Sequence, residues 1–115
     1  MAFLCIDFDK TIHDQDNPPK GHKLGPPLPL AKESMERLHD SGHYLMIHSC
    51  KSAAVIRPWL EYFKIPFDAI WGESPADVGC KPNGDVFIDD KALYHTSWEQ
   101  TMKELKDRGF ETKEG

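Results

Sequence analysis

The chain has 115 residues, of which 39% are hydrophobic and 29% are charged. This length fits one domain, residues 1–115, with a buried core, and it excludes an enzyme that needs separate cofactor and substrate domains. The formal net charge of −5 disfavours a protein that binds nucleic acid by neutralising phosphates.

Four strands and three helices are predicted, beginning with a strand at residues 2–6. This continuous apolar run is typical of a strand covered on both faces. Residues 13–29 are polar and rich in proline and glycine, so they predict a long loop that acts as a flap or mobile segment. A helix over 30–39 follows, with Gly42 as its stop, and Tyr44–Ile47 predicts a second buried strand.

The second half of the chain continues this alternation. Ser52 can cap a helix whose apolar face includes Val55 and Trp59, and Pro58 should kink it. Two short apolar runs predict the remaining strands, 69–71 and 86–88. Residues 98–105 predict a final amphipathic helix. This order is typical of a Rossmann-like α/β fold with three layers, a mainly parallel sheet and helices on both faces.

Polar side chains follow three of the predicted strands. Ligands of such folds bind at the carboxyl ends of the strands, so the residues found there are candidate site residues. They are Asp7 and Asp9 after the first strand, Ser49 after the second, and Asp89 and Asp90 after the fourth, with Lys81 in the loop before it. Several carboxylates in one cleft need a compensating cation, and hard oxygen ligands suit Mg²⁺. A lysine and a hydroxyl supply the charge and the donor that a phosphoryl group needs.

These segments resemble, in order, the four motifs of the haloacid dehalogenase (HAD) superfamily of phosphotransferases. The motifs are Asp7-Phe8-Asp9-Lys10-Thr11-Ile12, Ser49, Lys81-Pro82 and Ile88-Asp89-Asp90. The resemblance spans roughly 3–105 and implies a phosphatase that works through an aspartyl-phosphate. In this family pattern Asp7 is the nucleophile, Asp9 is the general acid and then the base, and Ser49 and Lys81 bind the phosphoryl group.

The resemblance also implies a magnesium site. Its ligands would be Asp7, the backbone carbonyl of Asp9, and Asp89, with Asp90 as a further ligand or as a partner of one. Lys10 stands where the family pattern commonly has glycine. Neither gap that holds a cap domain in the family is long enough here, so we expect an uncapped site.

The physiological substrate stays open. An uncapped site suits a large or polymeric phosphorylated substrate, or a small one closed in by a partner subunit. Nucleic-acid ends, phosphoproteins and sugar or lipid-precursor phosphates are all compatible, although the negative charge disfavours nucleic acid. No apolar run approaches the roughly 20 residues that span a bilayer. Without that run or a secretory signal, we expect a cytoplasmic protein with no membrane partner.

Three alternatives accompany this interpretation. Asp85 could replace Asp89 in a second form of the fourth motif, but the apolar run follows Asp85 and puts it at the strand entrance. The chain could instead be a non-enzymatic phospho-acceptor similar to a receiver module, or a pseudo-enzyme that only binds a phosphorylated ligand. Of the six histidines, His13, His22 and His48 are the ones expected to contact substrate.

Overall fold

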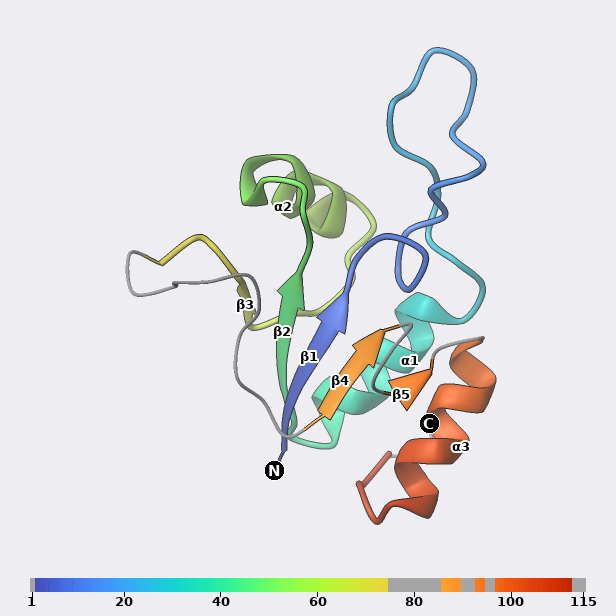
Figure 1. Ribbon diagram of the computed structural model, residues 1–115, viewed down its shortest axis with the longest axis vertical. Helices are drawn as coiled ribbons and strands as arrows, with labels where there is room; N and C mark the ends of the chain where they lie inside the picture. The colour runs from blue at the N-terminus through green and yellow to red at the C-terminus, as the bar shows by residue number, and fades with distance from the viewer. Residues whose placement is uncertain (1, 75–85, 90–92, 95–96, 113–115) are drawn as a thin grey trace.

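A five-stranded parallel sheet forms the centre of the molecule (Figure 1). The computed structural model describes residues 2–74, 86–89, 93–94 and 97–112. In chain order the strands are β1 (Phe3–Asp7), β2 (Tyr44–His48), β3 (Ala69–Ile70), β4 (Val86–Asp89) and β5 (Leu93–Tyr94). Their order across the sheet is β3-β2-β1-β4-β5, so the first strand of the chain is the central one. The four predicted strands are confirmed, and β5 is an addition to them.

The helices are α1 (Ala31–Asp40), α2 (Ala53–Tyr62) and α3 (Trp98–Asp107). Gly42 follows the end of α1 with a φ of 88°, which confirms the predicted stop because glycine adopts this left-handed conformation without strain. Ser52 takes the N-cap position of α2 as predicted, but its side chain makes no capping hydrogen bond. The helix continues through Pro58 to Tyr62.

The main core lies between one face of the sheet and the helices. Leu4 and Ile6 of β1 pair with Leu45 and Ile47 of β2 on one side, and all four side chains are fully buried. They join one apolar cluster with buried side chains from α1, α2 and α3. The expected α/β architecture is thus confirmed. The three described helices share one face of the sheet, so a helical layer on the second face stays a prediction.

Two details refine the predicted burial. Cys5 points to the other face of β1 and is also fully buried, which confirms that the continuous apolar run is covered on both faces. Val55 is 45% exposed, so its predicted place on the apolar face of α2 is wrong. Ile56 takes that place, because 56, 59 and 60 fall on one side of a helix with 3.6 residues per turn. None of the described helices could cross a bilayer.

Candidate functional site

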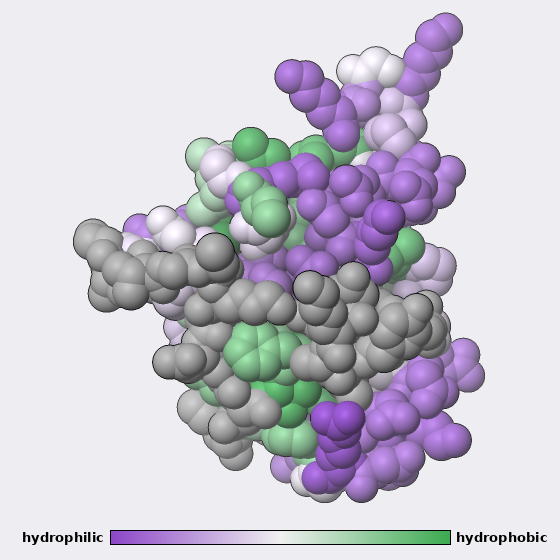
Figure 2. Space-filling model, in the orientation of Figure 1, coloured by the Kyte–Doolittle hydropathy of each residue, from purple (hydrophilic) through white to green (hydrophobic). Residues whose placement is uncertain are grey.

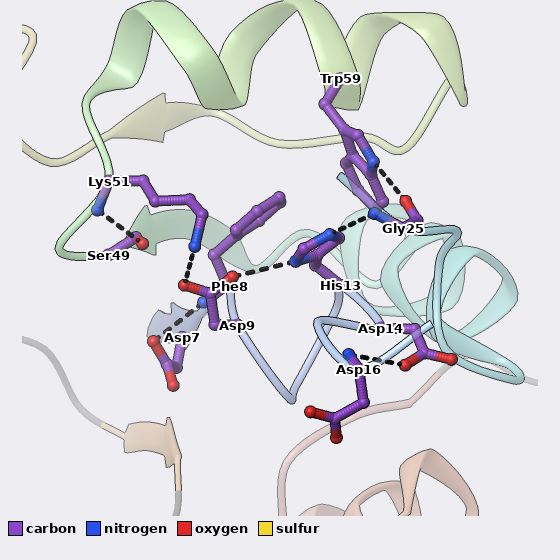
Figure 3. A network of polar contacts seen from close by, with 10 residues as sticks. All are labelled: Asp7, Phe8, Asp9, His13, Asp14, Asp16, Gly25, Ser49, Lys51 and Trp59. Carbon is purple, nitrogen blue, oxygen red and sulfur yellow. Dashed lines mark hydrogen bonds and ion pairs between the residues drawn. The ribbon is translucent and has the colours of Figure 1, made fainter. Parts of the chain in front are cut away.

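The predicted acids and the predicted serine meet at the carboxyl edge of the sheet. Asp7 ends β1 and pairs in register with His48, which ends β2. Asp9 follows two residues after Asp7, and Ser49 directly follows β2. Figure 3 shows Asp7, Asp9 and Ser49 at the same end of these two neighbouring strands. The structure therefore brings together three residues that lie up to 42 positions apart in the chain.

The register of β4 extends this arrangement on the other side of β1. Ile6 pairs with Ile88, and the next residue along each strand is Asp7 on β1 and Asp89 on β4. Neighbouring parallel strands lie about 4.8 Å apart, so the backbones of these two residues are adjacent. The side chain of Asp89 is not among the described parts of the structure. Lys81, Asp85 and Asp90 also lie outside the described residues.

A tight turn after β1 presents Asp9. The carbonyl of Phe8 accepts hydrogen bonds from the backbone amides of Thr11, Ile12 and His13. Lys10 adopts a left-handed φ of 64°, which an L-residue takes only at some conformational cost. Glycine would adopt this conformation without strain, because the turn requires a positive φ at the residue immediately after Asp9.

The carboxylate of Asp9 contacts two side chains. Lys51 Nζ lies 2.8 Å from Asp9 Oδ2, and His13 Nδ1 lies 2.9 Å from Asp9 Oδ1. The side chain of Asp9 is 22% exposed and that of Lys51 is 30% exposed, so this ion pair is partly shielded from water. Lys51 thus supplies the positive charge nearest to Asp9 in the described part of the site. The carboxylate of Asp7 has a different local partner, the backbone amide of Phe8, which donates to Oδ1 at 3.0 Å.

Sequence reasoning missed Lys51, although a local signal was present. Ser49 Oγ accepts a hydrogen bond from the backbone amide of Lys51 at 3.0 Å, which forms a short side-chain turn after β2. Serine is common in such turns. A serine at the end of a strand therefore indicates that the chain turns there, and that the residue two positions later lies near the strand end. In the structure this turn places Lys51 beside the acid that follows β1.

The histidines differ from the sequence expectation. His13 is 1% exposed and His48 is 7% exposed, so direct contact of either with a substrate disagrees with their burial. His22 lies exposed on the 13–29 loop, where contact remains a prediction. His13 instead joins Asp9 to Gly25, because one of its ring nitrogens contacts the Asp9 carboxylate and the other contacts the Gly25 amide (Figure 3).

The 13–29 loop is joined to the body of the protein at its base. Leu28 donates a backbone hydrogen bond to Ile12, and Asp14 donates one to Pro26, each at 2.8 Å. Beyond this base the loop extends away from the sheet, as the blue to cyan trace in Figure 1 shows. Gly25 closes the base: its amide donates to His13 Nε2 at 2.7 Å, and its carbonyl accepts from Trp59 Nε1 at 2.9 Å.

The loop base leaves no room for a side chain at position 25. A Cβ atom there would lie 2.1 Å from the carbonyl oxygen of Asp14, well inside van der Waals contact. We therefore expect Gly25→Ala to lower the free energy of unfolding by about 1–3 kcal/mol, the usual range for overpacking a tight site. Urea denaturation measures this change. Gly21→Ala gives no such steric clash, because a Cβ at Gly21 meets no atom within 4 Å, although its left-handed φ of 83° adds strain. A loss below about 1 kcal/mol in Gly25→Ala would contradict a steric clash at Gly25.

An ion pair secures the segment after β3. The guanidinium of Arg57 on α2 donates two hydrogen bonds to Glu73, at 2.7 Å from Nε and 2.6 Å from Nη2. These bonds raise the pKa of Arg57 above its usual range. The pair is solvent-exposed, so it contributes to local geometry more than to the free energy of unfolding.

Two surface hollows lie apart from the acids. A groove of about 660 Å³ between the 13–29 loop and α2 is lined largely by proline and aromatic side chains, including Trp59 and Tyr62. A polar hollow of about 910 Å³ is lined by residues such as Arg37 and Lys64. Neither lining includes Asp7 or Asp9. On the face shown in Figure 2, hydrophilic residues gather at the upper right, while apolar residues appear at the upper left and between the grey residues below.

The donor set around Asp7 can be compared with the needs of Mg²⁺. This ion is typically held by one or two carboxylates, with waters and substrate oxygens completing its shell. Asp7 is half-buried at the strand end. The backbone carbonyl of Asp9 is a further oxygen donor, and Asp89, whose backbone is adjacent to that of Asp7, carries a further carboxylate. In the described part of the chain, no three side chains of histidine, cysteine, aspartate or glutamate gather as metal ligands. Asp7 and the neighbouring backbone carbonyls offer oxygen donors of the kind that Mg²⁺ accepts.

The comparisons with known proteins give a structural likeness. No family model matches the chain, and no curated protein matches its sequence. A solved structure of a conserved protein from Bacteroides thetaiotaomicron is similar, with a TM-score of 0.73 and 23% sequence identity. The match covers 93% of this chain and 91% of that one. At this identity the likeness shows only that the two chains share their overall fold.

Proposed function

We propose that this protein is a Mg²⁺-dependent phosphatase of the HAD type, which hydrolyses a phosphomonoester through an aspartyl-phosphate. The observation that carries the proposal is the meeting of Asp7, Asp9 and Ser49 at the carboxyl edge of the two neighbouring strands β1 and β2. The adjacent backbone of Asp89 on β4 supports the same site. The parallel sheet order, with β1 at the centre, supports the Rossmann-like fold that this chemistry uses.

In this proposal Asp7 and Asp9 divide the chemistry between them. An oxygen of Asp7 attacks the phosphorus, the bond to the leaving oxygen breaks, and Asp9 gives that oxygen its proton. Asp9 then takes a proton from water as the water oxygen attacks the phosphorus of the aspartyl-phosphate. The bond between phosphorus and Asp7 breaks, which releases inorganic phosphate and restores both carboxyl groups to their starting states.

The other residues of the site bind and orient. Ser49 donates its hydroxyl proton to a phosphoryl oxygen, and Lys81 supplies a positive charge, as the family pattern implies. Lys51 adds a positive charge beside Asp9, where it holds the carboxylate in place through the 2.8 Å contact. Asp7, the carbonyl of Asp9, Asp89 and Asp90 would hold Mg²⁺. When bound, the ion would neutralise phosphoryl charge and lower the repulsion between the anionic substrate and Asp7.

The remaining features of the proposal concern the surroundings of the site. We propose an uncapped domain with helices on both faces of the sheet, in which the 13–29 loop is the flap. The substrate is a phosphorylated compound whose class stays open, and the net charge of −5 disfavours a nucleic-acid end. A cytoplasmic location agrees with an odd number of cysteines, three, one of which, Cys50, is an exposed thiol.

Phosphate release from p-nitrophenyl phosphate tests the proposal. We expect release by the purified protein in Mg²⁺, loss of release after chelation with EDTA, and recovery when Mg²⁺ is added back, because the carboxylate edge needs a cation to accept an anionic substrate. A Ca²⁺ addition is the control for charge without the octahedral geometry of Mg²⁺. Release that is unaffected by EDTA would contradict the metal requirement.

The lifetime of the phosphorylated protein separates an enzyme from a phospho-acceptor. Incubation with acetyl phosphate and intact mass spectrometry would detect addition of one phosphoryl group. Decay within seconds, with turnover, is expected for the phosphatase because Asp9 is placed to activate water. A modified form that persists for many minutes without turnover would favour a receiver-like module instead.

A further inference from the structure

His13 presents one ring nitrogen to the site and the other to the loop. Its Nδ1 lies 2.9 Å from Asp9 Oδ1, and its Nε2 lies 2.7 Å from the backbone nitrogen of Gly25. The Gly25 amide can only donate a hydrogen bond, so Nε2 must accept it and carries no proton. The ring proton of neutral His13 is therefore on Nδ1, from which it is donated to Asp9. One backbone amide of the loop thus determines which tautomer faces the acid.

The surrounding rings fix the plane of His13. The ring of Phe8 stacks on it with centroids 4.9 Å apart and an interplanar angle of 9°. Trp59 packs against it edge to face at 5.5 Å, and its indole nitrogen donates to the carbonyl of Gly25. Gly25 is thereby held at both its amide and its carbonyl. Turning the ring of His13 over would break the bonds to both Asp9 and Gly25, and the buried site offers little space for it.

The contacts form one chain from α2 to the acid, in the order Trp59, Gly25, His13, Asp9 (Figure 3). Every link lies in the described part of the structure, and each has a distance of 2.9 Å or less. His13 contributes no exposed atom that could reach a substrate, since the residue is 1% exposed. Its polar contacts therefore act on Asp9 and on the loop base.

We propose that His13 is a positioning residue: with its tautomer set by Gly25, it holds the Asp9 carboxylate in its working orientation and couples that orientation to the base of the 13–29 loop. This proposal rests on the proposed function only where it calls Asp9 the acid and base. The coupling itself follows from the hydrogen bonds. Displacing the loop base would leave Nε2 without its donor, so the tautomer that donates to Oδ1 of Asp9 would no longer be enforced. Lys51 is the only other side chain shown to contact Asp9 in the described residues.

Two substitutions separate the two contacts of His13. In His13→Asn the side-chain amide reaches the position of Nδ1, so it can donate to Asp9 but cannot reach Gly25. In His13→Gln the longer side chain reaches the position of Nε2, so its oxygen can accept from the Gly25 amide while the bond to Asp9 is lost. His39→Gln is the matched control, because His39 is an exposed histidine on α1 outside this network.

The two variants are expected to rank in opposite order in two measurements: amide exchange at Gly25 and kcat. Amide hydrogen exchange at Gly25 should stay slow in His13→Gln and become fast in His13→Asn. The kcat for p-nitrophenyl phosphate should fall in both variants, and about 10-fold further in His13→Gln, because orientation of a general acid contributes part of its 10²–10⁴-fold effect. KM should change little, since His13 does not touch substrate. His39→Gln should match the wild type in both measurements.

Nitrogen NMR of the wild-type protein decides the tautomer without any activity. We expect His13 to show a protonated Nδ1 and an unprotonated Nε2. A proton on Nε2 would overturn the proposal, and so would parallel changes of exchange and kcat in the two variants, which a packing role alone would produce. If the protein releases no phosphate, the proposed function fails, whereas the NMR and exchange results still decide the coupling. If both variants fail to fold, the tautomer of the wild type remains the deciding result.

Discussion

Replacing Asp7 with asparagine is expected to lower the kcat for p-nitrophenyl phosphate by at least about 10³-fold, because an amide cannot serve as the nucleophile. Asparagine has nearly the same shape as aspartate, and its oxygen can still accept from the Phe8 amide that contacts Asp7 Oδ1 at 3.0 Å. The fold should therefore be retained while the nucleophile is lost. Release of phosphate and trapping of the phosphorylated protein by mass spectrometry measure the two consequences together.

The control for this substitution is Asp107→Asn, which changes an exposed acid at the end of α3. Its activity should match that of the wild type, because the residue lies outside the site at the carboxyl edge. Circular dichroism of both variants would establish that each is folded. Activity of Asp7→Asn within a few-fold of the wild type would refute the assignment of Asp7 as the nucleophile.

The second large effect concerns Trp98, which attaches α3 to the turn that follows Asp9. Its side chain is 1% exposed, and its indole nitrogen donates to the carbonyl of Thr11 at 2.7 Å. We expect Trp98→Ala to lower the free energy of unfolding by about 3–5 kcal/mol, since it removes a large buried side chain. Trp98→Phe should lower it by about 1–3 kcal/mol, because the carbonyl of Thr11 loses its partner while an aromatic ring remains.

Urea denaturation of the two variants measures these losses. Tyr62→Ala provides the comparison, because Tyr62 is 78% exposed and its removal should change the free energy of unfolding by about 0.5 kcal/mol or less. Both variants lose the hydrogen bond to Thr11, so the difference between them measures the packing of the aromatic ring that Trp98→Phe keeps. Losses of equal size in Trp98→Phe and Tyr62→Ala would mean that the bond to Thr11 contributes nothing to stability.

Most strands of the sheet could be predicted from the sequence, because they coincide with short apolar runs. The run at 2–6 predicted the central strand, and its paired burial on both faces is seen at Leu4 and Cys5. The two-residue strand β5 was missed, although the run Ala92-Leu93-Tyr94 is as long as the run 69–71 that predicted β3. Runs of three residues do not separate a short strand from a loop. The exposed Val55 shows that an apolar side chain in a helix is not always buried. Its position in the 3.6-residue repeat decides which of two neighbouring apolar residues faces the core.

The site was predictable to the extent that it follows from topology. The carboxyl ends of neighbouring parallel strands lie at one edge of a sheet, so the sequence alone could place Asp7 and Ser49 together. The contacts of Asp9 with Lys51 and His13 could not, because they depend on the direction of side chains in two turns. The bond between His13 and Gly25 joins the two ends of an irregular loop, where no periodicity reports which residues meet.

The central position of β1 has a consequence for synthesis of the chain. This strand precedes both of its neighbours in the chain, and its second neighbour, β4, is available only when residues 86–89 emerge. Until then one side of the nascent ribbon carries unpaired amide and carbonyl groups, which are prone to association with other chains. About 80 residues must therefore be synthesised after β1 before this exposed edge can be closed.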